Sequence, residues 1–120
     1  MTSRLARILA GGQGGFYLLA GLWPIIHLGS FEAVTGPKTD DWLVKTVGLL
    51  VAVIGLTLLL AGRHRRVTPE MAMLGAGSAV GLATIDLVYA LSGVIAPVYL
   101  ADAVVEIAIA SLWAWSRGRG

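Results

Sequence analysis

The chain has 120 residues, of which 57% are hydrophobic and 13% are charged, with a formal net charge of +2 and no cysteine. Its mean hydropathy of +0.81 excludes an ordinary soluble domain, whose surface is largely wetted. The lack of cysteine excludes disulfides, thiolate metal sites and thiol redox chemistry. Since a membrane-spanning helix needs roughly 20 apolar residues, the length allows about four spans and no separate soluble domain.

The sequence supports the second predicted span more clearly than the first. The first, at about 8–27, follows Arg4 and Arg7 as the apolar run of a signal peptide does. GGQGG interrupts that run and no small-x-small cleavage site follows it, which favours an uncleaved helix. The second, at about 42–61, has Lys45 as its only charge.

The last two spans form a predicted hairpin. Pro69-Glu70 suits the first turn of a helix, and Ser92-Gly93 with Pro97 breaks the long apolar stretch that follows. The predicted fold class is therefore all-α, an integral membrane four-helix bundle in one transmembrane domain. Its spans lie at about 8–27, 42–61, 70–91 and 97–115, with an outer loop at 28–41 and a cytoplasmic loop at 62–69.

Basic residues gather at one end of this predicted bundle and give its orientation. They are Arg4, Arg7, Arg63, Arg65, Arg66, Arg117 and Arg119. The positive-inside rule places both termini in the cytoplasm of a multi-pass protein of the inner membrane. The tryptophans agree as interfacial anchors, Trp23 and Trp42 outside, Trp113 and Trp115 inside. We favour this topological role of the RHRR run over binding of anionic lipid or nucleic acid, and expect no nucleic-acid partner.

Small residues recur at helical spacing and predict close helix packing. In the second span Gly48, Ala52, Gly55 and Gly62 share one face. Further candidates are the pairs Gly11/Gly15 and Gly77/Gly81, and the ridge Gly75, Ala79 and Ala83. We interpret them as packing within the bundle, with the seam of a homo-oligomer as the alternative.

Three acids lie inside the predicted spans, where a charged side chain costs about 2.5–3.5 kcal/mol on insertion scales. Asp102 and Glu106 are four residues apart and share a helix face, and Asp86 lies at the depth of Asp102 on the adjoining helix. We expect these acids to line one outward-facing pocket and to titrate as a coupled set. Such a set holds a proton, binds a cation, or acts as general acid and base.

Other polar residues lie on the same predicted faces. The candidate catalytic residues are Glu106, Asp102, Asp86 and, as the fourth, His27. The candidate ligand-binding residues are Tyr89, Tyr99, Tyr17, Gln13, Lys45 and Trp113, with Lys45 as a counter-cation. A metal site of His27 with the carboxylates has no supporting HxxxH or ExxH spacing, and haem lacks a second deep histidine. We therefore predict neither metal nor cofactor.

The outer loop contains the residues that cap the second span and the motif that resembles other proteins. Thr39 or Asp40 caps the second span, and Glu32, Lys38 and Lys45 are candidate outer gates of a lid. W-P-x-x-H followed by SFEAVTGPKTDDWLVKTVG resembles a group of small bacterial four-helix membrane proteins, and the whole chain resembles the DoxX-like proteins in size and layout. The resemblance implies four helices and residence in the bacterial inner membrane, and transfers no activity.

Three functions remain open from the sequence. The leading one is a membrane protein whose carboxylate-lined pocket binds a small molecule, a cation or a proton, with a proton-coupled transporter as its specific form. The alternative is a membrane-embedded acid/base enzyme acting on a lipid or isoprenoid. The second alternative is an accessory structural subunit whose acids are merely paired. Expected partners are membrane lipids, a small-molecule, lipid or cation ligand, and further copies of the chain.

Overall fold

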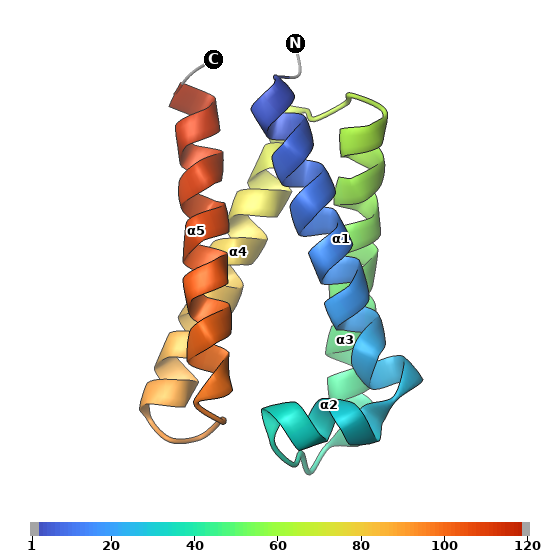
Figure 1. Cartoon of the computed structure of the whole chain (residues 1–120), viewed down its shortest axis with the longest axis vertical. Coiled ribbons are helices and arrows are strands. Elements are labelled where there is room, and N and C mark those ends of the chain that lie inside the picture. The colour runs from blue at the N-terminus through green and yellow to red at the C-terminus, as the bar shows by residue number, and fades with distance from the viewer. Residues whose placement is uncertain (1–2, 119–120) are drawn as a thin grey trace.

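The computed structural model describes residues 3–118, and all regular structure in that range is helical. Five helices follow one another along the chain (Figure 1): α1 Arg4–Ile26, α2 Leu28–Thr35, α3 Asp41–Arg63, α4 Pro69–Leu91 and α5 Val98–Gly118. At 1.5 Å per residue, the 23-residue helices α1, α3 and α4 measure about 34 Å and the 21-residue α5 about 32 Å, slightly more than the roughly 30 Å hydrocarbon core of a bilayer. The all-α prediction is confirmed.

Local chemistry explains where the helices begin. The Ser3 hydroxyl accepts a hydrogen bond from the Ala6 N–H at the start of α1, and the Thr68 hydroxyl accepts one from the Met71 N–H at the start of α4. Pro69 occupies the first turn of α4, where its missing N–H costs nothing. Asp40 is the N-cap residue of α3 but makes no side-chain capping bond.

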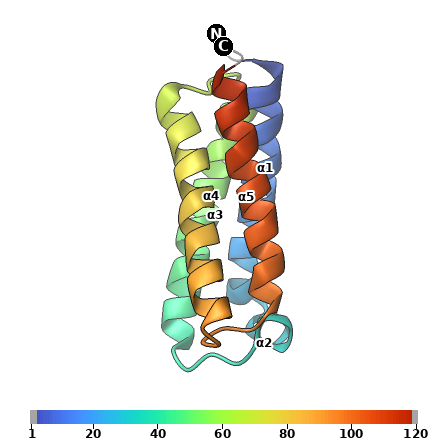
Figure 2. The ribbon, with the colours of Figure 1, turned by 90° about the vertical axis from the view of Figure 1, so that its left-hand side faces the viewer.

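The four long helices form two antiparallel pairs, α1 with α3 and α4 with α5 (Figures 1 and 2). The pairs approach each other at the end that holds the start of α1, the α3–α4 connection and the end of α5, here called the terminal end. They diverge at the opposite end, called the loop end, where α2 and the α4–α5 turn lie. Leu9, Ala10, Ala72 and Trp113 form the apolar core that joins the pairs.

Glycine residues at the contact allow α1 and α3 to pack closely. A Cβ on Gly14 would lie 2.6 Å from the Gly55 carbonyl oxygen, and a Cβ on Gly48 would meet the Gly21 carbonyl, so neither position has room for a side chain. The predicted face of Gly48, Ala52, Gly55 and Gly62 is buried as expected. The other predicted pairs differ, because a Cβ on Gly11, Gly15 or Gly81 would meet nothing within 4 Å. In α4 the ridge Gly75, Ala79 and Ala83 is the buried one.

Large apolar side chains lie on the outside of the molecule, while small and polar residues fill the inside. Leu19 is 72% exposed, Val104 is 68% exposed and Leu50 is 59% exposed, whereas Glu106 is 1% exposed. A water-soluble protein buries its leucines and valines and exposes its acidic side chains to water. The reverse arrangement is typical of a surface solvated by lipid, against which helices associate through small residues.

Membrane-crossing capacity follows from length and composition. Three helices are long and apolar enough to cross a membrane, at Asp41–Arg63, Pro69–Leu91 and Val98–Arg117. A fourth span is added if α1 and α2, which meet at an angle of 112°, count as one broken span. The chain is thus an all-α protein with three to four candidate spans, compatible with a multi-pass membrane protein.

The bend between α1 and α2 was not foreseen, and it explains the W-P-x-x-H motif. Pro24 lies inside the last turns of α1, and His27 leaves helical geometry at φ −146°. The His27 Nδ1 then accepts the Ser30 N–H at 3.1 Å, which starts α2 within the predicted outer loop. Trp23 holds the corner by donating to the Ser30 hydroxyl at 2.8 Å and packing edge-on against Phe31.

Candidate functional site

A hydrogen bond between Tyr17 and Glu106 joins the two helix pairs inside the molecule. The Tyr17 hydroxyl donates to the Glu106 Oε1 at 2.5 Å, and the two residues are 2% and 1% exposed. Tyr17 comes from α1, whose close glycine contact with α3 fixes its position, and Glu106 comes from the middle of α5. The contact satisfies one oxygen of a carboxyl group that would otherwise be buried at high cost.

The other two interior acids continue from Glu106 toward the loop end. Asp102, half-buried one turn away on α5, lies close enough to Glu106 and to Asp86 on α4 to interact with both. Asp86 is 4% exposed, and within residues 3–118 no N–H or O–H donor reaches its Oδ2. No lysine, arginine or histidine is among the groups that act on Asp86 or Glu106. Among the described residues, Asp86 and Glu106 therefore lack a compensating cation.

A second polar contact lies on the terminal side of Tyr17. The Trp113 Nε1 donates to the Gln13 Oε1 at 2.7 Å, and the Gln13 Nε2 donates to the Gly75 carbonyl oxygen at 2.8 Å. Gly75 is required there, because a Cβ would lie 2.7 Å from the Trp113 Nε1. Gln13 also interacts with the Tyr17 hydroxyl and so links this contact to Glu106. The predicted interfacial role of Trp113 is wrong, because its ring is buried and only Trp115 of that pair is exposed.

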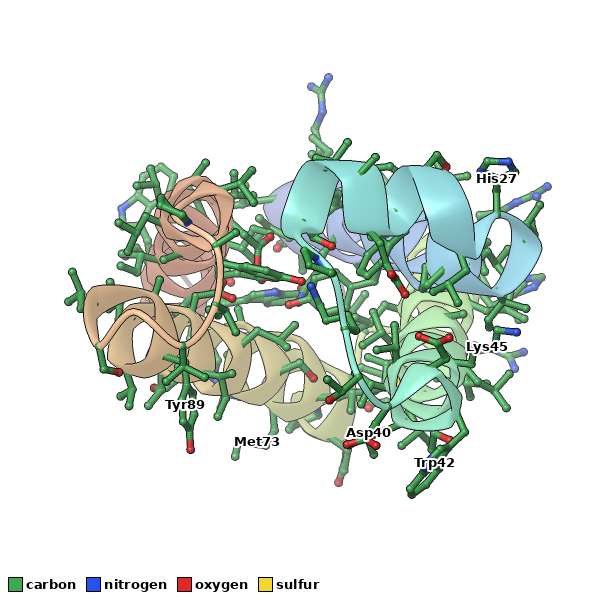
Figure 3. The ribbon with its side chains drawn as sticks, turned by 90° about the horizontal axis from the view of Figure 1, so that it is seen from below. His27, Asp40, Trp42, Lys45, Met73 and Tyr89 are labelled. Atoms are coloured by element: carbon green, nitrogen blue, oxygen red, sulfur yellow. The ribbon has the colours of Figure 1, made fainter. Side chains whose placement is uncertain are left out.

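Three of the predicted site residues lie outside this interior. His27, Lys45 and Tyr89 project from the outside of the bundle (Figure 3). His27 caps α2 rather than facing an acid, and the exposed Tyr89 projects away from the interior. Lys45 is no counter-cation to the buried acids, since it is absent from the groups that act on them.

Tyr99 and Lys38 meet at the loop end, above Asp102. The Lys38 Nζ lies 5.4 Å from the centre of the Tyr99 ring and 5.8 Å from that of Phe31. It also donates to the carbonyl oxygens of Thr35 and Gly36 at 3.0 and 2.8 Å. Lys38 thus ties the end of α2 to the start of α5 at the loop end.

Sequence reasoning missed the Gly75 carbonyl and the α2 helix. The carbonyl of a packing glycine carries no side-chain signal, so its role as an acceptor is visible only in three dimensions. The α2 helix had a signal in Pro24 followed three residues later by His27, a helix break followed by a capping residue.

A hollow on the surface of the structure lies far from the acids. It is a groove of about 270 Å³ between the end of α3 and the start of α4, at the terminal end. Within residues 3–118 no group of three or more histidine, cysteine, aspartate or glutamate residues is placed to hold a metal ion.

The structure therefore belongs to the class of all-α chains with three to four candidate membrane spans. Its distinguishing feature is the acids buried between its helix pairs. Comparison with protein-family models, with curated proteins and with solved structures gave no match.

Proposed function

We propose that this chain is a four-span protein of the bacterial inner membrane, DoxX-like in layout, with both termini in the cytoplasm. Although α1 alone is less apolar than the other long helices, it equals α3 in length and packs along it, so both would traverse the same depth. The basic residues Arg4, Arg63 and Arg117 all belong to the terminal end, which supports its cytoplasmic placement.

We further propose that Asp86, Asp102 and Glu106 form one carboxyl cluster that binds and exchanges protons. The single observation that carries this is the proximity of the three carboxyl groups, with no basic residue among the groups that act on Asp86 or Glu106. Ionised carboxylates only accept hydrogen bonds, so two carboxyl groups form one only when a proton lies between them. Close carboxyl groups without a cation can therefore share a hydrogen bond by holding a proton, which suits the cluster to proton binding.

The surroundings of the cluster support exchange rather than permanent protonation. On α5 the residues Tyr99, Asp102, Glu106, Trp113 and Ser116 recur at steps of three, four, seven and three, which places them along one face. This face runs from the loop end to the terminal end of the bundle. Asp102, the half-buried member, connects the buried Glu106 to the loop end. We propose that protons enter there, and that their exchange is coupled to binding or transport of a small molecule or cation.

The enzyme and subunit alternatives stay predictions of the sequence. A lipid-processing enzyme would need a lipid-sized cavity beside Glu106, and the groove of about 270 Å³ lies elsewhere. A purely structural subunit would pair its acids with cations, whereas Asp86 and Glu106 have no such partner among the described residues.

Infrared difference spectroscopy tests the proposal, because a protonated carboxyl group and a carboxylate absorb at different frequencies. When the pH of the solubilised protein is changed, we expect carboxyl bands that change in Asp102→Asn and Glu106→Gln. Each of these substitutions should also shift the bands of the remaining acids, since interacting groups titrate together. Glu70→Gln, at an exposed acid of the terminal end, is the matched control. Bands that respond alike in all three variants would contradict the proposal.

A further inference from the structure

The groove between α3 and α4 has apolar walls and a basic rim. Leu60, Ala61 and Met71 form its walls, and Thr57, His64, Arg66 and Thr68 complete the lining. The Thr57 hydroxyl donates to the Val53 carbonyl of its own helix, so its hydrogen-bonding capacity is already used within α3. The groove is open to the outside of the molecule, on a helix surface that carries exposed leucines.

The backbone that carries the basic rim is held in place by hydrogen bonds. Arg65 has a positive φ of 55°, which reverses the chain after α3. The Arg66 N–H then donates to the Ala61 carbonyl at 2.8 Å, and the Thr68 N–H donates to the Arg66 carbonyl at 3.0 Å. This fixes the Cα of Arg66 at the edge of the groove before any ligand arrives.

The charges of the rim are available to an anion. The exposed side chains of His64 and Arg66 make no hydrogen bond or ion pair with any residue between 3 and 118. Arg63 precedes them, and the N-terminus of α4, with its partial positive charge, follows. Glu70 in the first turn of α4 is exposed and is not part of the lining.

We propose that this groove binds one anionic phospholipid, with an acyl chain against Leu60 and Met71 and the phosphate at Arg66 and His64. A groove that is apolar toward the bilayer centre and cationic at its edge matches a phospholipid, whose charge lies at one end. Basic pockets between helices on the cytoplasmic side of membrane proteins bind anionic headgroups in this way. The inference rests on membrane insertion and is independent of proton exchange by the carboxyl cluster.

The test is native mass spectrometry of the detergent-solubilised chain with phosphatidylglycerol and phosphatidylcholine of identical acyl chains. We expect wild type to retain one phosphatidylglycerol in preference to phosphatidylcholine. Arg66→Gln should weaken retention about fivefold, the equivalent of roughly 1 kcal/mol per basic residue near an anionic surface. Ala61→Phe should abolish it by filling the groove.

Matched controls separate the groove from general surface charge. Arg117→Gln removes a basic residue of the same end that does not line the groove, and Leu49→Phe enlarges an exposed residue elsewhere on α3. Both should retain phosphatidylglycerol as wild type does, and so should Glu106→Gln. Equal retention of both lipids, equal losses in Arg66→Gln and Arg117→Gln, or full retention in Ala61→Phe would overturn the proposal. Displacement by equimolar inorganic phosphate would also overturn it, since a bare anion would then suffice.

Discussion

Tyr17 and Glu106 meet at 2.5 Å although 89 residues separate them in the chain, and this hydrogen bond ties the α1–α3 pair to the α4–α5 pair. Both side chains are fully buried, so neither has water as an alternative partner. A tyrosine donor is what a buried carboxyl group needs when no basic residue is present. The contact therefore serves the stability of the bundle and the chemistry of its interior together.

Loss of this donor should destabilise the protein. Tyr17→Phe keeps the ring and removes the hydroxyl, leaving the Glu106 Oε1 without a donor at a cost of about 1–3 kcal/mol. Reversible unfolding in mixed micelles measures the change. Tyr89→Phe, at an exposed position, is the control and should change stability by less than about 0.5 kcal/mol. Equal stability of the two variants would show that the bond adds nothing.

The close glycine contact of α1 with α3 should tolerate no added methyl group. In Gly55→Ala the new Cβ would lie 2.6 Å from the Gly14 carbonyl oxygen, so the helices must move apart. We expect a loss of about 1–3 kcal/mol, as for other overpacked contacts. Gly15→Ala, with nothing within 4 Å, should show no loss in the same unfolding assay. If Gly15→Ala proved the more damaging change, the helix register described above would be wrong.

His27 should matter for the α1–α2 corner and not for proton exchange. His27→Ala removes the acceptor for the Ser30 N–H and should cost about 0.5–2 kcal/mol, while His27→Asn retains a capping acceptor and should cost less. Both variants should keep the wild-type rate of proton flux in liposomes. A flux lost in both would restore His27 as a member of the site.

The proposed orientation can be checked by thiol labelling, since the sequence contains no cysteine to interfere. Thr39→Cys, just before α3, and Arg63→Cys, at its last residue, introduce exposed thiols near its opposite ends. With a membrane-impermeant maleimide on intact spheroplasts, we expect labelling of Thr39→Cys at once and of Arg63→Cys only after permeabilisation. The opposite order would invert the proposed topology.

Hydrophobic periodicity and helix-breaking residues were enough to predict much of the helical architecture. The ends of α4 and α5 carry strong local signals in Pro69, Ser92-Gly93 and Pro97, and the helices begin or end within a few residues of them. The α2 helix was missed, because a short helix folded against a corner has little hydrophobic pattern of its own. The small-residue face of α3 was visible in its spacing, whereas the spacing alone could not tell Gly11/Gly15, which point outward, from Gly14, which packs.

Helical spacing also had limits in predicting which side chains lie in the interior. Of the candidate site residues, the structure brings together Asp86, Asp102, Glu106, Tyr17, Gln13 and Trp113. Helical spacing placed these on inward faces because each lies on a stripe with an acid or a small residue. Tyr89 shows where spacing fails, since three residues turn a helix by less than one full turn and the tyrosine projects outside. His27 lies beyond the end of α1, where the spacing of that helix no longer applies.

Proton flux through liposomes that contain the purified chain tests the central claim most directly. An imposed pH gradient, followed with a trapped pH-sensitive dye, should collapse faster with wild-type protein and with Glu70→Gln than in protein-free liposomes. Glu106→Gln, folded and inserted as wild type by unfolding and thiol-labelling assays, should reduce the rate to that of protein-free liposomes. A wild-type rate in Glu106→Gln would contradict proton exchange by the carboxyl cluster.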